Sequence, residues 1–162
     1  MPSPARMARP PWTRCDLITA ANVDSIAVLD DDIKFIRLVE RILRQEHIDV
    51  WPVTTLDLDE AVRVVEQSAC SAALVDIYMY GDCAGFALIE KLRANPSTAD
   101  LPLIVTSAAH REVGRKVGFL VKNKCSVLLK PFEVDDLLTK VRAARPPRAV
   151  MYQVVAPANS AD

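Results

Sequence analysis

Five polar side chains stand at or just after the end of a short apolar run: Asp30, Asp31, Asp76, Thr106 and Lys130. In a parallel sheet with helical crossovers all strands end at one edge, so residues far apart in the chain would meet in one crevice. Carboxylates packed closely repel one another unless a divalent cation lies between them. Mg²⁺ is a hard, oxygen-seeking ion that suits such a site and usually retains several waters. These residue types therefore predict a magnesium site with a hydroxyl and an ammonium beside it.

Strands and helices in alternation must position these side chains. Short apolar runs predict strands over residues 26–29, 50–53, 72–75, 101–105 and 127–129. Apolar residues at helical spacing predict helices over residues 33–43, 61–65, 86–92, 110–122 and 133–144. The helix over 110–122 is the weakest because it contains Gly114 and Gly118. In the last helix we expect an inward face of Val134, Leu137, Leu138 and Val141.

This alternation predicts an α/β fold with a doubly wound, five-stranded parallel sheet and helices on both faces. Pro52 removes a backbone donor from the second strand, which therefore belongs at a sheet edge. An edge position fits the flavodoxin-like order 2-1-3-4-5. A ligand would then lie at the carboxyl ends of strands one and three, which deliver Asp30, Asp31 and Asp76.

Size and composition favour one domain. A chain of 162 residues that is 51% hydrophobic can bury one sizeable core, and its net charge of -1 argues against direct nucleic-acid binding. No apolar run approaches the roughly 20 residues that span a bilayer, and no secretory signal is recognisable. A cytoplasmic protein with free thiols at its scattered cysteines is expected. His47 and His110 are expected at surfaces or helix ends.

The ends of the chain differ from its middle. Residues 1–23 are rich in proline and arginine and are expected to be a flexible N-terminal extension, whereas residues 24–144 form the domain. Residues 145–162 are expected to be a C-terminal tail that begins with a proline-containing break. Within the tail, residues 149–155 are apolar and β-prone. That stretch either packs on the body, packs on a second copy in a possible homodimer, or stays disordered.

Four motifs, in this order, resemble the receiver domain of two-component response regulators. They are Val28-Leu29-Asp30-Asp31, Asp76-Ile77-Tyr78-Met79, residues 101–108 (LPLIVTSA) and Val127-Leu128-Leu129-Lys130-Pro131-Phe132. The resemblance covers about residues 24–144 and implies a signalling protein rather than an enzyme. Taken singly, the residues have plainer readings: the aspartates as helix caps, Thr106 as a core hydroxyl and Lys130 as a loop cation.

The resemblance assigns roles to individual residues. It implies that Asp76 is the phosphoacceptor and that Mg²⁺ is held by Asp30, Asp31, Asp76 and the main-chain carbonyl of Tyr78. Thr106 and Lys130 would bind phosphoryl oxygens, since phosphoryl transfer depends mainly on positioning and charge neutralisation. It also implies a cis peptide at Lys130-Pro131.

The chain departs from the family pattern at several positions. Tyr80 stands where the family usually has proline, and Gly85 lies one position late, which suggests an inserted residue. Val127 replaces the usual aromatic switch residue, so its coupling to Thr106 is absent or rebuilt. Tyr78 and Ala108 occupy positions that tune the lifetime of the phosphoryl group in the family. Asp32 is surplus to the acidic pair and is expected at the helix start.

The leading hypothesis is a phosphoacceptor response regulator that is served by a histidine kinase or phosphotransfer protein. Lacking an effector domain in this sequence, it would signal through an unknown downstream protein, without binding nucleic acid or membrane directly. One alternative is a receiver-like interaction scaffold that no longer uses phosphorylation. A less favoured alternative is an aspartate-nucleophile phosphatase using Asp30 and Asp32, although residues 33–35 lack the threonine that family expects.

Overall fold

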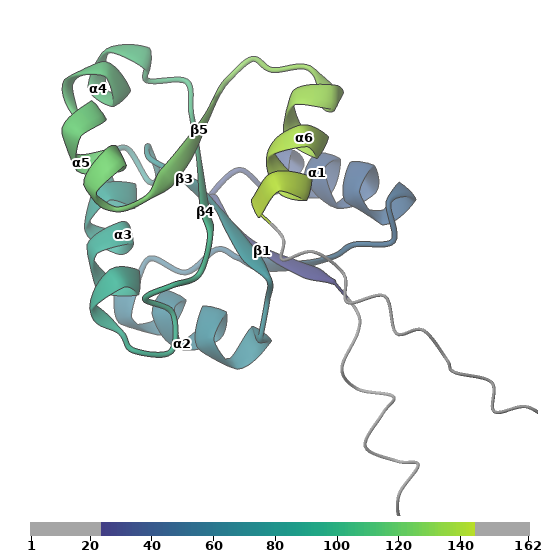
Figure 1. Cartoon of the computed structure of the whole chain (residues 1–162), viewed down its shortest axis with the longest axis horizontal. Helices are drawn as coiled ribbons and strands as arrows, with labels where there is room; N and C mark the ends of the chain where they lie inside the picture. Colours follow the sequence, from purple (N-terminus) through teal and green to yellow (C-terminus); the bar gives the residue numbers. More distant parts are fainter. Residues whose placement is uncertain (1–23, 145–162) are drawn as a thin grey trace, which may run out of the picture.

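The computed structural model describes residues 24–144, which form a five-stranded parallel sheet in the order β2-β1-β3-β4-β5 (Figure 1). This confirms the predicted fold class. The strands are β1 (Ser25–Leu29), β2 (Asp49–Val53), β3 (Ala72–Asp76), β4 (Leu103–Ser107) and β5 (Cys125–Leu129). The helices are α1 (Ile33–Gln45), α2 (Leu58–Ser68), α3 (Ala84–Ala94), α4 (His110–Arg115), α5 (Val117–Lys122) and α6 (Val134–Ala144).

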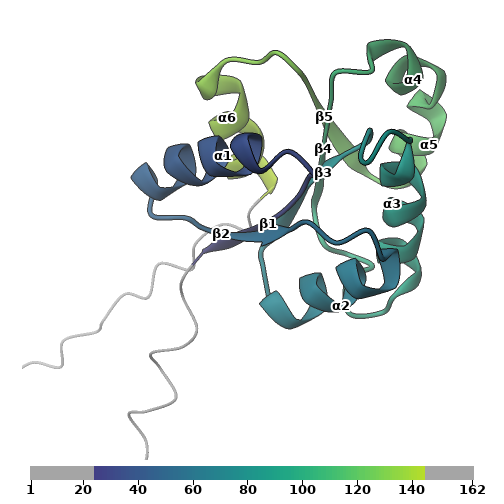
Figure 2. The same ribbon diagram turned by 180° about the vertical axis from the view of Figure 1, so that it is seen from behind.

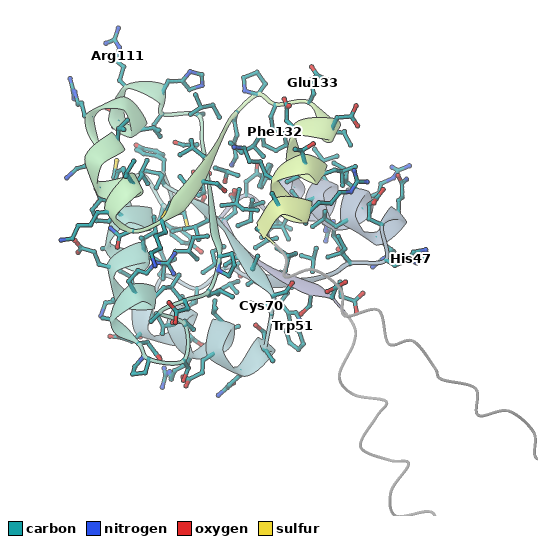
Figure 3. All side chains as sticks on the ribbon, in the orientation of Figure 1. His47, Trp51, Cys70, Arg111, Phe132 and Glu133 are labelled. Atoms are coloured by element: carbon teal, nitrogen blue, oxygen red, sulfur yellow. The ribbon has the colours of Figure 1, made fainter. Side chains whose placement is uncertain are left out.

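Helices cover both faces of the sheet, with α1 and α6 on one face and α2, α3, α4 and α5 on the other (Figures 1 and 2). Neighbouring strand residues point to opposite layers, so Leu74 packs with α1 and α6 while Val75 packs with α2 and α3. The central strands are buried on both faces and therefore read as continuous apolar runs. Figure 3 shows side chains filling both layers, with Arg111 and Glu133 projecting outward.

The second strand lies at the sheet edge, as its proline predicts. Pro52 is the register partner of Val28 in β1, and no other strand of the described chain pairs with β2 on its far side. Asp49 and Trp51 of this strand are exposed, whereas β1 is buried throughout. The missing proline donor therefore costs no ladder hydrogen bond in the middle of the sheet.

The predicted single helix over residues 110–122 is wrong, because the segment forms two short helices. Lys116 interrupts them with φ -107° and ψ 16°, and its N–H is shared between the carbonyls of Glu112 and Val113. Gly114 and Gly118 flank the break, and each lowers helix stability by roughly 1 kcal/mol relative to alanine. This element is therefore the least regular of those that cover the sheet.

Some apolar positions also differ from the predicted inward faces. Val134 of α6 is 48% exposed, while Leu137 and Val141 are fully buried. The first residue of a helix packs less than residues a turn later, because the chain is still approaching the sheet at that point. The strand predicted over 101–105 begins instead at Leu103, since Pro102 lacks a ladder donor.

The start of α1 is fixed by an aspartate cap. The Asp32 carboxylate accepts hydrogen bonds from the N–H groups of Lys34 and Phe35, which confirms a helix-start position for this third acid.

The predicted N-terminal extension (1–23) and C-terminal tail (145–162) lie outside the described residues.

Candidate functional site

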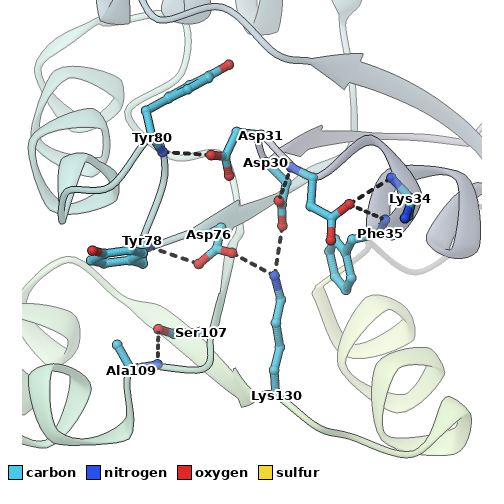
Figure 4. Close-up of polar contacts among 11 residues, drawn as sticks. Asp30, Asp31, Lys34, Phe35, Asp76, Tyr78, Tyr80, Ser107, Ala109 and Lys130 are labelled. Carbon is cyan, nitrogen blue, oxygen red and sulfur yellow. Dashed lines mark hydrogen bonds and ion pairs between the residues drawn. The ribbon is translucent and has the colours of Figure 1, made fainter.

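An ammonium group joins two carboxylates at the carboxyl edge of the sheet (Figure 4). Lys130 Nζ lies 2.6 Å from Asp76 Oδ2 and 2.8 Å from Asp30 Oδ2. Lys130 follows β5, Asp76 ends β3 and Asp30 follows β1, and these strands run in the same direction. The predicted convergence of these strand-end residues is therefore present. A cation between two acids neutralises part of the charge that burial makes unfavourable.

Burial and neighbouring charges shift the pKa values of Asp30 and Lys130. Burial raises the pKa of the Asp30 carboxyl and the nearby Asp76 charge adds to the rise, while the bonds from Lys130 and the Asp32 N–H oppose it. For Lys130, burial alone would lower the pKa, but the hydrogen bonds to Asp30 and Asp76 outweigh it and the pKa is raised. The ammonium is thus held in its charged form beside Asp76.

Asp31 points toward the loop after β3 rather than toward Lys130. Its Oδ2 accepts a 2.7 Å hydrogen bond from the main-chain N–H of Tyr80. Tyr80 has a left-handed backbone with φ 55°, and its hydroxyl donates to the carbonyl of Thr54 in the β2–α2 loop. Tyr80 therefore links this acid to a second loop, a role the sequence did not predict.

A magnesium ion fits the donors that are present. In residues 24–144 no group of three or more His, Cys, Asp or Glu side chains is arranged as a metal site; Lys130 pairs with Asp30 and Asp76, and Asp31 accepts from the Tyr80 N–H. Mg²⁺ needs only one or two carboxylates, with water at the other positions. The oxygen-only donors Asp30, Asp31 and Asp76 meet that requirement.

Thr106 contributes a buried hydroxyl next to the acid. It is the register partner of Asp76 on the neighbouring strand and is fully buried. Its Oγ1 has no hydrogen-bond partner among the described residues. A buried hydroxyl without a partner is costly, so its position is unfavourable unless a ligand oxygen accepts from it.

The backbone of Lys130 is fixed on both sides. Its N–H donates to the carbonyl of Ser107 at 2.8 Å, and its own carbonyl accepts from His110 Nε2 at 2.8 Å. The Lys130-Pro131 peptide bond is cis. His110 is exposed at the first position of α4, which confirms the expected helix-end position, and it also connects α4 to the lysine loop.

The remaining predicted site residues lie around this cluster. The Tyr78 N–H donates to Asp76 Oδ1 at 3.0 Å, and its side chain is half exposed. Ala108 is exposed in the β4–α4 loop. Val127 lies in β5 opposite Val105 and packs, half-buried, against the core that α2 and α3 cover.

Gly85, the second residue of α3, occupies a position where only a glycine fits against the end of β3. A Cβ at this position would lie 2.2 Å from the Asp76 carbonyl oxygen and 2.6 Å from Ile77 Cα. The Gly85 N–H also donates to the Ile77 carbonyl, which draws the start of α3 against the end of β3. This close approach holds the backbone that carries Asp76.

Phe35 is a site neighbour that sequence reasoning missed. Its ring centroid lies 3.8 Å from Lys130 Nζ, and its ring makes an edge contact with Phe132 at 6.0 Å between centroids. A lone phenylalanine near a helix start carries no chemical signature of its own. Only the three-dimensional structure brings it to the ammonium.

The comparisons with known proteins agree with this fold and with the cluster of strand-end acids and lysine. The sequence profile described as the response regulator receiver domain matches residues 26–142. The chain belongs to this family, whose members act in two-component signalling.

The chain is 30% identical over 116 residues to the heme response regulator HssR of Staphylococcus aureus (strain JH9), a match that covers 72% of this chain and 49% of that protein. The chain thus spans about half the length of the curated relatives it matches. A sensor protein from Polaromonas sp. JS666 matches with a TM-score of 0.64 and 27% identity, covering 75% of this chain and 94% of that one.

A receiver domain of the sensor histidine kinase PA1611 from Pseudomonas aeruginosa PAO1 has the same fold. It matches with a TM-score of 0.62 and 22% identity over 75% of this chain and 97% of its own, and its structure has magnesium coordinated in the active-site cleft. Within residues 24–144, no helix is both long and apolar enough to cross a membrane.

Proposed function

We propose that this protein is a phosphoacceptor response regulator and that Asp76 receives the phosphoryl group. The observation that carries the proposal is the 2.6 Å contact between Lys130 Nζ and Asp76 Oδ2. An ammonium that is fixed beside a carboxylate at the carboxyl edge of a parallel sheet can neutralise charge on an incoming phosphoryl oxygen. Asp76 is also the strand-end acid on β3, between the acids after β1 and the lysine after β5.

In the proposed step, an oxygen of Asp76 forms a bond to phosphorus while the bond from phosphorus to the donor breaks. The donor is a phosphohistidine of a histidine kinase or phosphotransfer protein, and its nitrogen leaves with the bonding electrons. Lys130 moves its hydrogen bond from the carboxylate to a phosphoryl oxygen. The Thr106 hydroxyl donates to another phosphoryl oxygen and thereby gains the partner it lacks.

We propose that Asp30, Asp31, Asp76 and the main-chain carbonyl of Tyr78 hold Mg²⁺. When bound, the ion neutralises charge that accumulates on the phosphoryl oxygens. Asp30 and Asp76 are buried and Asp31 is partly exposed, so bulk water screens that interaction only weakly. Output would then pass to a downstream protein through a changed surface of the receiver domain.

Intact mass spectrometry after incubation with a small acyl phosphate tests this proposal. The full chain is incubated with Mg²⁺, with Mg²⁺ plus a chelator, and as the Asp32→Asn variant, which keeps the helix cap but alters an acid outside the cluster. One added phosphoryl group with Mg²⁺, lost on chelation and retained in Asp32→Asn, is the expected result. No added phosphoryl group under any condition would overturn the proposal and favour a phosphorylation-independent scaffold.

A further inference from the structure

Lys130 has a contact that is neither a hydrogen bond nor an ion pair. Its Nζ lies 3.8 Å from the centroid of the Phe35 ring, well inside the roughly 6 Å over which a cation is attracted to an aromatic face. Both side chains are only partly accessible, and the Lys130 side chain is 20% exposed. A cation–π contact strengthens as it loses water, so this contact is in a favourable setting.

The Phe35 ring is itself held in place from two directions. Its edge-to-face contact with Phe132 comes from the loop that directly follows Lys130. The backbone N–H of Phe35 donates to the Asp32 carboxylate at 3.3 Å. Phe35 therefore lies in the turn that also carries Asp30. The ring, in the first turn of α1, and the ammonium, in the loop after β5, are therefore held next to each other by the Phe35–Phe132 contact.

We propose that Phe35 is a positioning residue that holds the Lys130 ammonium at the phosphoryl-binding position. The inference rests on the proposed function, because it assigns a second partner to the lysine of that same site. A ring face attracts a cation without accepting its N–H donors strongly, unlike a carboxylate. Phe35 thus steadies Lys130 while leaving its hydrogen bonds available to transfer from Asp76 to a phosphoryl oxygen.

The chain offers a matched control for this idea. Phe86 makes the same kind of edge contact, with Phe119 at 5.5 Å, and has Lys116 at 5.7 Å from its centroid. That group lies in the layer of α3 and α5, on the opposite face of the sheet from α1. Phe86→Leu therefore removes an equivalent ring and its packing without touching Lys130, whereas Phe35→Leu removes the ring that faces it.

Two measurements on the full chain separate positioning from packing. Lysine labelled with ¹³C at Cε reports the ring-current shift of Lys130, whose signal is assigned by its absence in Lys130→Met. Beryllofluoride affinity in the presence of Mg²⁺ reports binding of a phosphoryl mimic. Both are measured for the parent, Phe35→Leu, Phe35→Tyr and Phe86→Leu.

We expect Phe35→Leu to abolish the ring-current shift and weaken beryllofluoride binding about three- to tenfold. Phe35→Tyr retains a ring face and should preserve both, and Phe86→Leu should change neither. A shift that persists in Phe35→Leu, an unchanged affinity, or an equal effect of Phe86→Leu would overturn the inference. If the parent does not bind beryllofluoride, the proposed function fails, and the ring-current comparison alone then decides whether Phe35 positions Lys130.

Discussion

Lys130 Nζ lies 2.6 Å from Asp76 Oδ2, although 54 positions separate the two residues in the chain. The contact exists because β3 and β5 run parallel on either side of β4 and end at the same edge. The lysine loop is anchored to Ser107 at the end of β4, so the sheet itself sets the distance between ammonium and acid.

Replacing Asp30 should stabilise the protein at neutral pH while weakening its proposed activity. Burial raises the pKa of Asp30 in the folded state above its ordinary value of 3.8, so the charged carboxylate lowers the free energy of unfolding at pH 7. That loss of stability is regained as the pH falls toward 3.8 and the carboxylate becomes protonated. Asp30→Asn should therefore unfold at a higher temperature than the parent at pH 7, and the gap should narrow as the pH is lowered. Thermal unfolding over that range checks this, and a gap that widens on acidification would contradict it.

Alanine should have opposite effects at two glycines. Gly85→Ala places a Cβ against the Asp76 carbonyl and Ile77 Cα, and overpacking of this kind costs roughly 1–3 kcal/mol. Gly114→Ala meets no atom within 4 Å and should stabilise α4 by about 0.5–1 kcal/mol. Urea unfolding of both variants measures the two changes in the free energy of unfolding. Changes of the same sign would show that the close approach at Gly85 is unimportant.

The switch should run through α4 and α5 rather than through an aromatic side chain. Val127 offers no ring to move toward Thr106, whereas the interrupted helices around Lys116 form a weakly stabilised element. Hydrogen exchange with and without beryllofluoride should change protection across residues 110–122, and Gly114→Ala should reduce that change. Unchanged exchange in this segment, with changes elsewhere, would contradict the prediction.

The phosphorylated form should be long-lived. Tyr78 provides bulk beside Asp76, to which its N–H donates, and Ala108 offers no side-chain hydrogen bond to an attacking water. Tyr78→Asn with Ala108→Glu should speed loss of phosphate about tenfold, equivalent to about 1.4 kcal/mol in the barrier. Tyr78→Phe keeps the bulk and should decay at the parental rate. A double variant that decays no faster would show that these positions do not set the lifetime.

The sequence predicted the strand order and the meeting of Asp30, Asp76 and Lys130 because both depend on short-range patterns. Apolar runs define the strands, Pro52 defines an edge, and parallel strands must end together. Each of these rules acts within a few residues, so each is readable without the tertiary structure.

The details that sequence reasoning missed depend on contacts between distant side chains. The bond between Asp31 and the Tyr80 N–H requires a left-handed tyrosine in the loop after β3, which no local pattern signals. The Phe35 ring gains a functional neighbour only because the fold brings it to Lys130. The helix breaks at Lys116 because tertiary packing does not compensate for the low helix stability of this segment.

Locating the phosphoryl group on the chain tests directly whether Asp76 is the phosphoacceptor. Borohydride reduces an aspartyl phosphate to homoserine, so peptide mapping after phosphorylation and reduction identifies the modified residue. We expect homoserine at position 76 alone, and no incorporation of phosphate in Asp76→Asn. Homoserine at position 30 or 31, or undiminished labelling of Asp76→Asn, would contradict it.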